Sequence, residues 1–276
     1  MSESAMEGGR PRWAWYARSF WGLFLRDGRV LLREFIRLIL QSAVQPLLFF
    51  FIFTYVFPKI GQGFSGGSPR ASFATILVPG FLAVSIFFAG ISSVALPLAT
   101  ELGRNGEIED RIMAPVPIWL VGMEKVTFSA VQGIISAAIV LPIAYLVPAG
   151  GVSLHVHDWP LLVAVVLLAS FTAGSLGLAL GTVIKPQQIG LLFGIIVTPL
   201  IFLGCVYYPW ANLQPVRWLQ IVILLNPLVY VSEGLRAALT PQVHHMPPWA
   251  FLGALSALLI GLTAFGLRSF YRRVVT

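Results

Sequence analysis

Residues 223–239 read ILLNPLVYVSEGLRAAL, an apolar stretch that contains one acid and one base, Glu233 and Arg236. Charged side chains are rare inside a bilayer or a protein core, and they are kept there when they pair or carry a function. These two residues are three positions apart, which places them on one face of a helix. The stretch therefore predicts an ion pair in apolar surroundings.

The same stretch begins with the start signal of a helix. Asn226 can cap a helix and Pro227 suits its first turn, and Tyr230, Glu233 and Arg236 follow on one face. We expect a helix whose ion pair faces protein or water. The alternative is an amphipathic helix that lies at the membrane surface.

Nucleotide binding can be tested directly, because a phosphate-binding P-loop ends in Gly-Lys-Ser or Gly-Lys-Thr. Each lysine of the chain follows a residue other than glycine: Lys59 follows Pro58, Lys125 follows Glu124 and Lys185 follows Ile184. A Walker A loop is therefore excluded, and we expect no cofactor in this chain. If ATP and Mg²⁺ drive the protein, they bind to a separate subunit.

Two other chemistries stay open as alternatives. Ion-coupled transport usually places acids or histidines inside the membrane, and Glu233 is the single candidate for an ion-coupled secondary transporter. A metal-dependent intramembrane enzyme would need a ligand cluster. Its candidates are His155, His157, Asp158, His244 and His245. Solvated loop histidines are the simpler interpretation.

The composition indicates an integral membrane protein. Of 276 residues, 57% are hydrophobic and 11% are charged, whereas soluble domains have about 25% charged residues. The mean hydropathy is +0.85. The net charge of +7 comes from arginines at the ends of apolar runs rather than from a basic domain, so nucleic acid is not an expected partner.

Six uncharged runs are long enough to span a bilayer, which takes about 17–25 residues; they are 38–57, 73–100, 126–147, 159–184, 189–208 and 248–267. We therefore predict an all-α membrane protein with six transmembrane helices. If the N-terminus is cytoplasmic, 14 of the 18 Lys and Arg residues lie inside and 4 outside, as the positive-inside rule requires. Both termini are then cytoplasmic, and the outer segment 209–247 enters the membrane and returns as a re-entrant hairpin.

Residues 1–37 form a cytoplasmic tail and a predicted amphipathic helix ahead of the first run. Five arginines fall within an arc of roughly 100°, with phenylalanines on the far side. They are Arg18, Arg26, Arg29, Arg33 and Arg37. Such a helix lies in the membrane surface, where its arginines contact lipid headgroups or a cytoplasmic partner.

The inner segment 101–125 is short and charged, and it reads ELGRNGEIEDRIMAPVPIWLVGMEK. A short charged helix that ends at prolines suits docking on a protein partner. The candidate docking residues are Arg104, Glu107, Glu109, Asp110, Arg111 and Pro115. An ordinary solvated connector is the alternative.

Four stretches together resemble the ABC-2 type exporter permeases, the transmembrane subunits of bacterial ABC exporters. They are the arginine-rich helix before LQSAVQPLLFFFIFTYVF, then LVPGFLAVSIFFAGISSVALPLATE, GEIEDRIMAPVPIWLVGMEKV and LLNPLVYVSEGLRAAL. The resemblance implies a six-span domain over 38–276, a connecting helix before it, a coupling helix at about 104–113 and re-entrant helices before the last span.

The resemblance also implies a function and its partners. Two permease copies, identical or different, would pair with two separate ABC ATPase subunits, which bind ATP and Mg²⁺. The complex would sit in the lipids of the bacterial plasma membrane. It would export a drug or a lipid-linked or glycan-type molecule, with an amphipathic or glycolipid-like substrate as the expectation.

Overall fold

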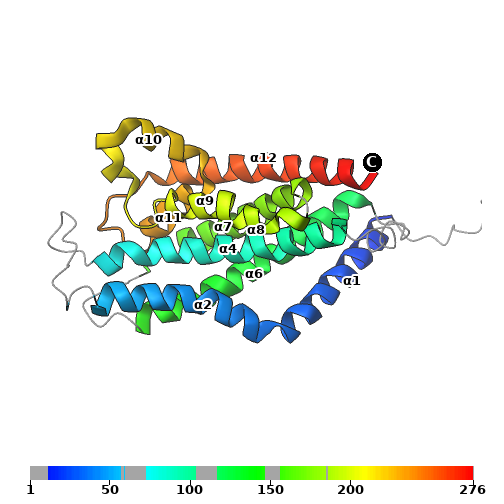
Figure 1. The fold of residues 1–276 in the computed structure, drawn as a ribbon, viewed down its shortest axis with the longest axis horizontal. Helices are drawn as coiled ribbons and strands as arrows, with labels where there is room; N and C mark the ends of the chain where they lie inside the picture. The colour runs from blue at the N-terminus through cyan, green and yellow to red at the C-terminus, as the bar shows by residue number, and fades with distance from the viewer. Residues whose placement is uncertain are drawn as a thin grey trace, which may run out of the picture.

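A computed structural model describes residues 12–56, 59, 73–103, 117–146, 156–184 and 186–275. These residues are almost entirely helical and contain no strand (Figure 1). The all-α expectation is therefore confirmed for the described part of the chain. The predicted docking residues between Arg104 and Pro115 lie outside it.

Four of the described helices are long and apolar enough to cross a membrane. They are α4 (Phe73–Gly103), α6 (Ile118–Leu146), α7 (Trp159–Val183) and α12 (Pro248–Val275). A bent pair of helices near residue 226 passes the same test when it is counted as one span. The described ranges thus contain four or five such spans, and the count of six stays a prediction.

The core of the bundle is α7, which packs against α4, α6 and α12. Glycines allow this close approach. A Cβ on Gly177 would lie 3.0 Å from the carbonyl oxygen of Ile91, and one on Gly181 would lie 3.0 Å from the Cα of Ala95. In contrast, a Cβ on Gly190 would meet nothing within 4 Å, so this glycine is not needed for packing.

The N-terminal part consists of α1 (Arg12–Arg33) and α2 (Phe35–Phe51), which is followed by a π turn (Ile52–Val56). The chain bends at Glu34, and α1 leans away from the bundle axis while α2 runs along it (Figure 1). The predicted interfacial helix therefore ends before Arg37, which belongs to α2. Both α1 and α2 contact α6.

Two predicted spans have different limits in the structure. The third was expected at 126–147, but α6 begins at Ile118, so Glu124 and Lys125 lie within the helix. The fifth, expected at 189–208, is a chain of short pieces. It consists of a 3₁₀ turn (Pro186–Gln188), α8 (Ile189–Leu191), a π turn (Leu192–Val197) and α9 (Thr198–Phe202).

The segment before α12 folds back on itself. It comprises η4 (Trp210–Val216), α10 (Arg217–Val222), η5 (Ile223–Leu225) and α11 (Pro227–Leu239). The direction changes by 103° at Asn226. As a result α10 lies at one end of the molecule, while α11 packs between α4, α7 and α12 (Figure 1).

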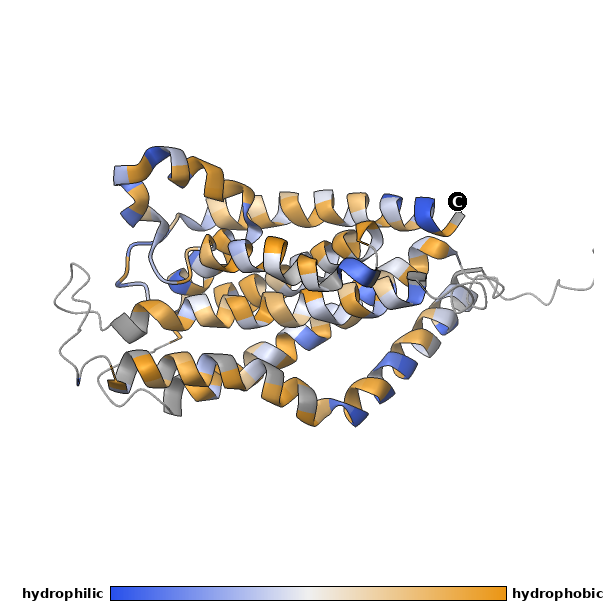
Figure 2. Ribbon diagram, in the orientation of Figure 1, coloured by the Kyte–Doolittle hydropathy of each residue, from blue (hydrophilic) through white to orange (hydrophobic). Residues whose placement is uncertain are grey.

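Hydropathy follows the long axis of the bundle (Figure 2). The middle of each long helix is mostly apolar, whereas polar residues gather along α1 and at the C-terminal end of α12 (Figure 2). The end of α12 and the start of α1 lie at the same end of the molecule (Figure 1). This distribution is the one that an apolar belt around a membrane protein requires.

Candidate functional site

The first candidate site is built on α11, and Asn226 sets its start. The Asn226 Oδ1 accepts a hydrogen bond of 2.9 Å from the Leu228 backbone N–H, which caps the helix as expected. Its Nδ2 donates to the Leu200 carbonyl at 2.7 Å. Pro227 follows in the first turn, where its missing N–H has no partner to lose. One side chain thus begins α11 and ties it to α9.

Tyr230 fixes the bend from the other side. Its hydroxyl donates a hydrogen bond of 2.8 Å to the Leu224 carbonyl in η5. Because Leu224 precedes the bend and Tyr230 follows it, this bond holds the two arms of the segment together. Tyr230 is partly exposed, and it is the exception on a helix whose other residues are all buried. The alternative of a helix lying at the membrane surface is therefore wrong.

Glu233 and Arg236 form an ion pair whose side chains are both 0% exposed. The Arg236 Nη1 donates to Glu233 Oε1, and its Nη2 donates to the Cys205 carbonyl at 2.9 Å. Cys205 has a φ of 53°, a left-handed conformation that non-glycine residues rarely adopt. The strained turn directs its carbonyl toward the guanidinium.

The Glu233 carboxylate is also bonded to two distant parts of the backbone. Its Oε1 accepts from the Trp210 N–H at 3.0 Å, and its Oε2 accepts from the Met246 N–H at 2.9 Å. These bonds join the start of the hairpin to the segment before α12. A buried charge is tolerable only when such partners replace its hydration. The cluster therefore connects α11 to the backbone at Cys205, Trp210 and Met246.

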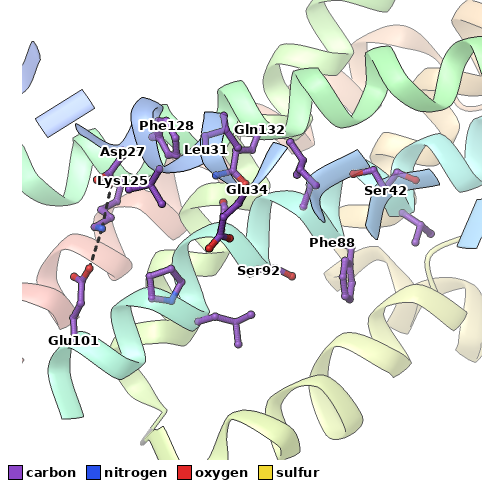
Figure 3. A pocket seen from close by; sticks show the side chains of 18 of the residues that line it. Asp27, Leu31, Glu34, Ser42, Phe88, Ser92, Glu101, Lys125, Phe128 and Gln132 are labelled. Atoms are coloured by element: carbon purple, nitrogen blue, oxygen red, sulfur yellow. Dashed lines mark hydrogen bonds and ion pairs between the residues drawn. The ribbon is translucent and has the colours of Figure 1, made fainter. Parts of the chain in front are cut away.

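The second candidate site is a cavity of about 460 Å³ between α1, α2, α4 and α6. Its charged end includes Asp27, Glu34, Glu101 and Lys125, and phenylalanines such as Phe88 line the other part (Figure 3). Charged and apolar walls in one space are the usual composition of a ligand pocket.

Lys125 organises the charged end. Its Nζ lies 3.5 Å from Asp27 Oδ2 and 3.4 Å from Glu101 Oε1 (Figure 3). The Lys125 side chain is 7% exposed, and Arg26 also pairs with Asp27 at 2.8 Å. One ammonium thus joins α1 to α4 and α6, and the last two are the helices on either side of residues 104–116. Sequence reasoning missed this cluster, although an acid among five arginines was a usable signal.

The remaining predicted residues are placed less informatively. Of the five arginines predicted to share one face of the N-terminal helix, Arg18, Arg26, Arg29 and Arg33 are exposed, and the side chain of Arg37 lies outside the described residues. His157 is exposed, and Asp158 caps α7 by accepting from the Leu161 N–H at 3.0 Å. Within the described ranges no three metal-ligating side chains come together.

Comparison with known proteins identifies the family of this chain. Residues 18–240 match the family model described as ABC-2 type transporter. The chain belongs to that family. It is 27% identical over 208 residues to the inner membrane transport permease YadH of Escherichia coli K12. The aligned residues make up 74% of this chain and 78% of the relative. The same permease of Shigella flexneri matches over the same shares.

The family match covers most of both candidate sites, because residues 18–240 include the larger part of α1, the residues that line the cavity, and α11. The resemblance seen in the sequence is therefore confirmed at the level of the family. As an ABC-2 member with several membrane-crossing helices, the permease is a transmembrane subunit of an ABC transporter.

Proposed function

We propose that the permease forms the translocation path of an ATP-driven exporter in a bacterial inner membrane. The observation that carries the proposal is the ABC-2 match over residues 18–240 in a chain that cannot form a Walker A loop. Energy must then come from a separate ABC ATPase subunit. The inner membrane is the location named for the E. coli relative, and it fits the apolar helices here.

The proposed topology has six spans, with both termini in the cytoplasm and the 209–247 segment re-entering from outside. The charge bias of the sequence supports it. So does the burial of α11 beside α4, α7 and α12, because non-continuous helices at membrane depth need protein around them. The five arginines that the sequence places on one face of the N-terminal helix suit contact with lipid headgroups or with the ATPase.

Cysteine labelling tests this topology. In a Cys205→Ala background, single cysteines at Ser68, Ser153 and Gln242 are expected to react with an impermeant thiol reagent from outside. Cysteines at positions 3 and 276 are expected to react only after the membrane is opened. Outside labelling at either terminal position would contradict the proposal.

The proposed contact with the ATPase is the charged segment 104–116. It connects α4, which carries Glu101, to α6, which carries Lys125. A partner that moves this segment would act on these two helices, and through the contact of Lys125 with Asp27 also on α1. Its proposed docking residues are Arg104, Glu107, Glu109, Asp110, Arg111 and Pro115.

Replacing Glu109, Asp110 and Arg111 with alanine is expected to leave the permease inserted and folded. The variant is expected to lose substrate-stimulated ATP hydrolysis in vesicles that contain both subunits. A matched control replaces Arg217, His244 and His245 at the other end of the molecule, and it is expected to keep that activity. Normal ATPase binding and export in the first variant would refute the docking assignment.

The ion-coupled alternative depends on Glu233, and its contacts oppose that role. The carboxylate is 0% exposed and accepts from Arg236 and two backbone N–H groups, so a proton or sodium ion would have to displace them. We propose a pair of permease copies in the complex, identical or different. The proposed substrate class is a drug or a lipid-linked or glycan-type amphiphile.

A further inference from the structure

The helix α1 has an apolar face that the bundle leaves uncovered. At about 100° per residue, Trp21, Leu25 and Leu32 fall within an arc of roughly 40°, and they are 55–75% exposed. We call these three residues the exposed apolar stripe of α1. The side of α1 that meets the bundle is a different one, where Phe24 contacts Phe128 of α6. An exposed apolar surface of this kind marks contact with a membrane or a protein.

The apolar surface continues from α1 onto α2. Leu32 and Ile36 lie one helical turn apart on either side of the bend at Glu34, and both are 75% exposed. Leu40 and Val44 follow at four-residue steps and are 57% and 48% exposed. Because α2 lies in the first of the proposed spans, these side chains face acyl chains. The bilayer that covers α2 therefore also covers the stripe of α1.

The helix α1 also carries a surplus of positive charge. It contains five arginines and a single acid, Asp27, and the Asp27 carboxylate already pairs with Arg26 and Lys125. Three further arginines are exposed and fall within an arc of roughly 60° beside the apolar stripe. They are Arg18, Arg29 and Arg33. Exposed cations next to an apolar face are typical of a helix that binds an anionic membrane surface.

The lipid-facing side of α1 is connected to the bundle through its neighbours. The ring centroid of Trp21 lies 5.6 Å from that of Phe24, and the centroid of Phe24 lies 5.7 Å from that of Phe128 on α6, both edge to face. One turn further along α1, Asp27 contacts Lys125 of the same helix α6 (Figure 3). A ligand that holds Trp21 therefore also holds α1 against α6 beside the cavity.

We propose that α1 is a binding surface for anionic phospholipid. The guanidinium groups of Arg18, Arg29 and Arg33 bind headgroup phosphates, and the exposed apolar stripe inserts between the acyl chains next to them. The surplus of cations selects an anionic headgroup, because a zwitterionic headgroup carries no net charge to attract. The placement of α1 at the cytoplasmic leaflet rests on the proposed function and its topology.

Quenching of Trp21 fluorescence tests this surface in the full-length permease, without an ATPase. Two sets of phosphatidylcholine vesicles are compared, in which the minor component is a brominated phosphatidylglycerol or a brominated phosphatidylcholine with the same acyl chains. Bromine quenches a tryptophan that it touches, and the difference from Trp21→Phe isolates the signal of Trp21 among the eight tryptophans. Phosphatidylglycerol is expected to be preferred at Trp21 about tenfold or more. Equal quenching in both sets, or quenching in neither, would overturn the proposal.

Substitutions assign the headgroup to the arginines. Arg29→Gln is expected to reduce the preference about fivefold, which is the contribution of one arginine near an anionic surface. Replacing Arg18, Arg29 and Arg33 together with glutamine is expected to remove it. Arg268→Gln is the matched control, because it removes the same charge from an exposed position near the end of α12, and it is expected to change nothing. Equal losses in Arg29→Gln and Arg268→Gln would contradict the assignment, since net charge alone would then explain them.

The competing occupant of the arginine face is the ATPase subunit. The triple glutamine variant is expected to lose its lipid preference and to copurify with the ATPase as the unchanged permease does. An unchanged lipid preference in this variant would refute the lipid assignment, and a simultaneous loss of copurification would give the face to the ATPase. Because neither ATP nor transport enters the vesicle measurement, its result stands apart from that of ATP-driven export.

Discussion

Two charge clusters lie toward opposite ends of the permease and are built in different ways. Under the proposed topology one of them is the outer cluster, in which Glu233 and Arg236 belong to one helix, are fully buried and bond to backbone groups of three other segments. In the inner cluster, Lys125 joins Asp27 and Glu101 from two other helices at 3.4–3.5 Å beside a cavity. The Glu233–Arg236 cluster is enclosed by protein, whereas the Lys125 cluster borders the cavity.

The difference has a mechanical consequence. The backbone positions of charges at i and i+3 keep their spacing as long as the helix is intact, and burial holds both side chains in place, so the outer cluster behaves as a fixed tie. Charges on three different helices separate when one helix moves as a rigid body. We therefore expect α11 to stay in place during the transport cycle, while α1 moves relative to α4 and α6.

The largest expected effect comes from breaking the outer tie. Glu233→Gln leaves the Arg236 charge buried without its partner, and the free energy of unfolding is expected to fall by about 3–5 kcal/mol. The double change Glu233→Gln with Arg236→Gln is expected to be less damaging than the single change. Unfolding in detergent measures both. Equal and negligible losses in these variants would show that solvent reaches the pair.

A smaller effect is expected from the backbone that supports this tie. A Cβ on Gly80 would lie 2.2 Å from the Val206 carbonyl oxygen, next to Cys205. Gly80→Ala must therefore shift the turn that receives Arg236, at a cost of about 1–3 kcal/mol. Gly190→Ala is the control, because nothing lies within 4 Å of its added Cβ. A stability loss of the same size in both variants would argue against the contact.

The smallest effect is expected at the inner cluster. Lys125→Met removes the shared ammonium, but Asp27 keeps Arg26, and water can reach both carboxylates from the cavity. We expect a loss of about 1 kcal/mol or less. Amide hydrogen exchange is expected to rise in α1 and to stay unchanged in α11. A loss as large as that of Glu233→Gln would remove the contrast between the two clusters.

The fold and the outer site were largely predictable because their signals are local. Long uncharged runs specify apolar helices, and Asn226-Pro227 followed by Glu233 and Arg236 specifies a capped helix with an ion pair. The inner site was predictable only in part. Asp27 among the arginines was a local signal that this acid has a role, but Asp27, Glu101 and Lys125 are far apart in the chain, and no local pattern shows that three helices bring them together.

The wrong span limits have the same origin. Hydropathy placed the start of the third span after Lys125, because a charge in an apolar helix is unfavourable on its own. The structure begins α6 at Ile118, since Asp27 and Glu101 neutralise Lys125 there. The helical part of the fifth run ends at Phe202 rather than at 208, because the chain then turns at Cys205, whose carbonyl accepts from Arg236.

The sequence by itself determined that this is an all-α membrane protein without a Walker A loop, because composition, periodicity and the missing Gly-Lys pair depend on neighbouring residues only. Only the tertiary structure decided which charged side chains are buried and which lie beside a cavity. It buried Glu233 and Arg236 completely, placed Lys125 between two acids, and left a cavity beside them. These outcomes depend on which helices pack together, since the cost of a charge is set by the groups that replace its water.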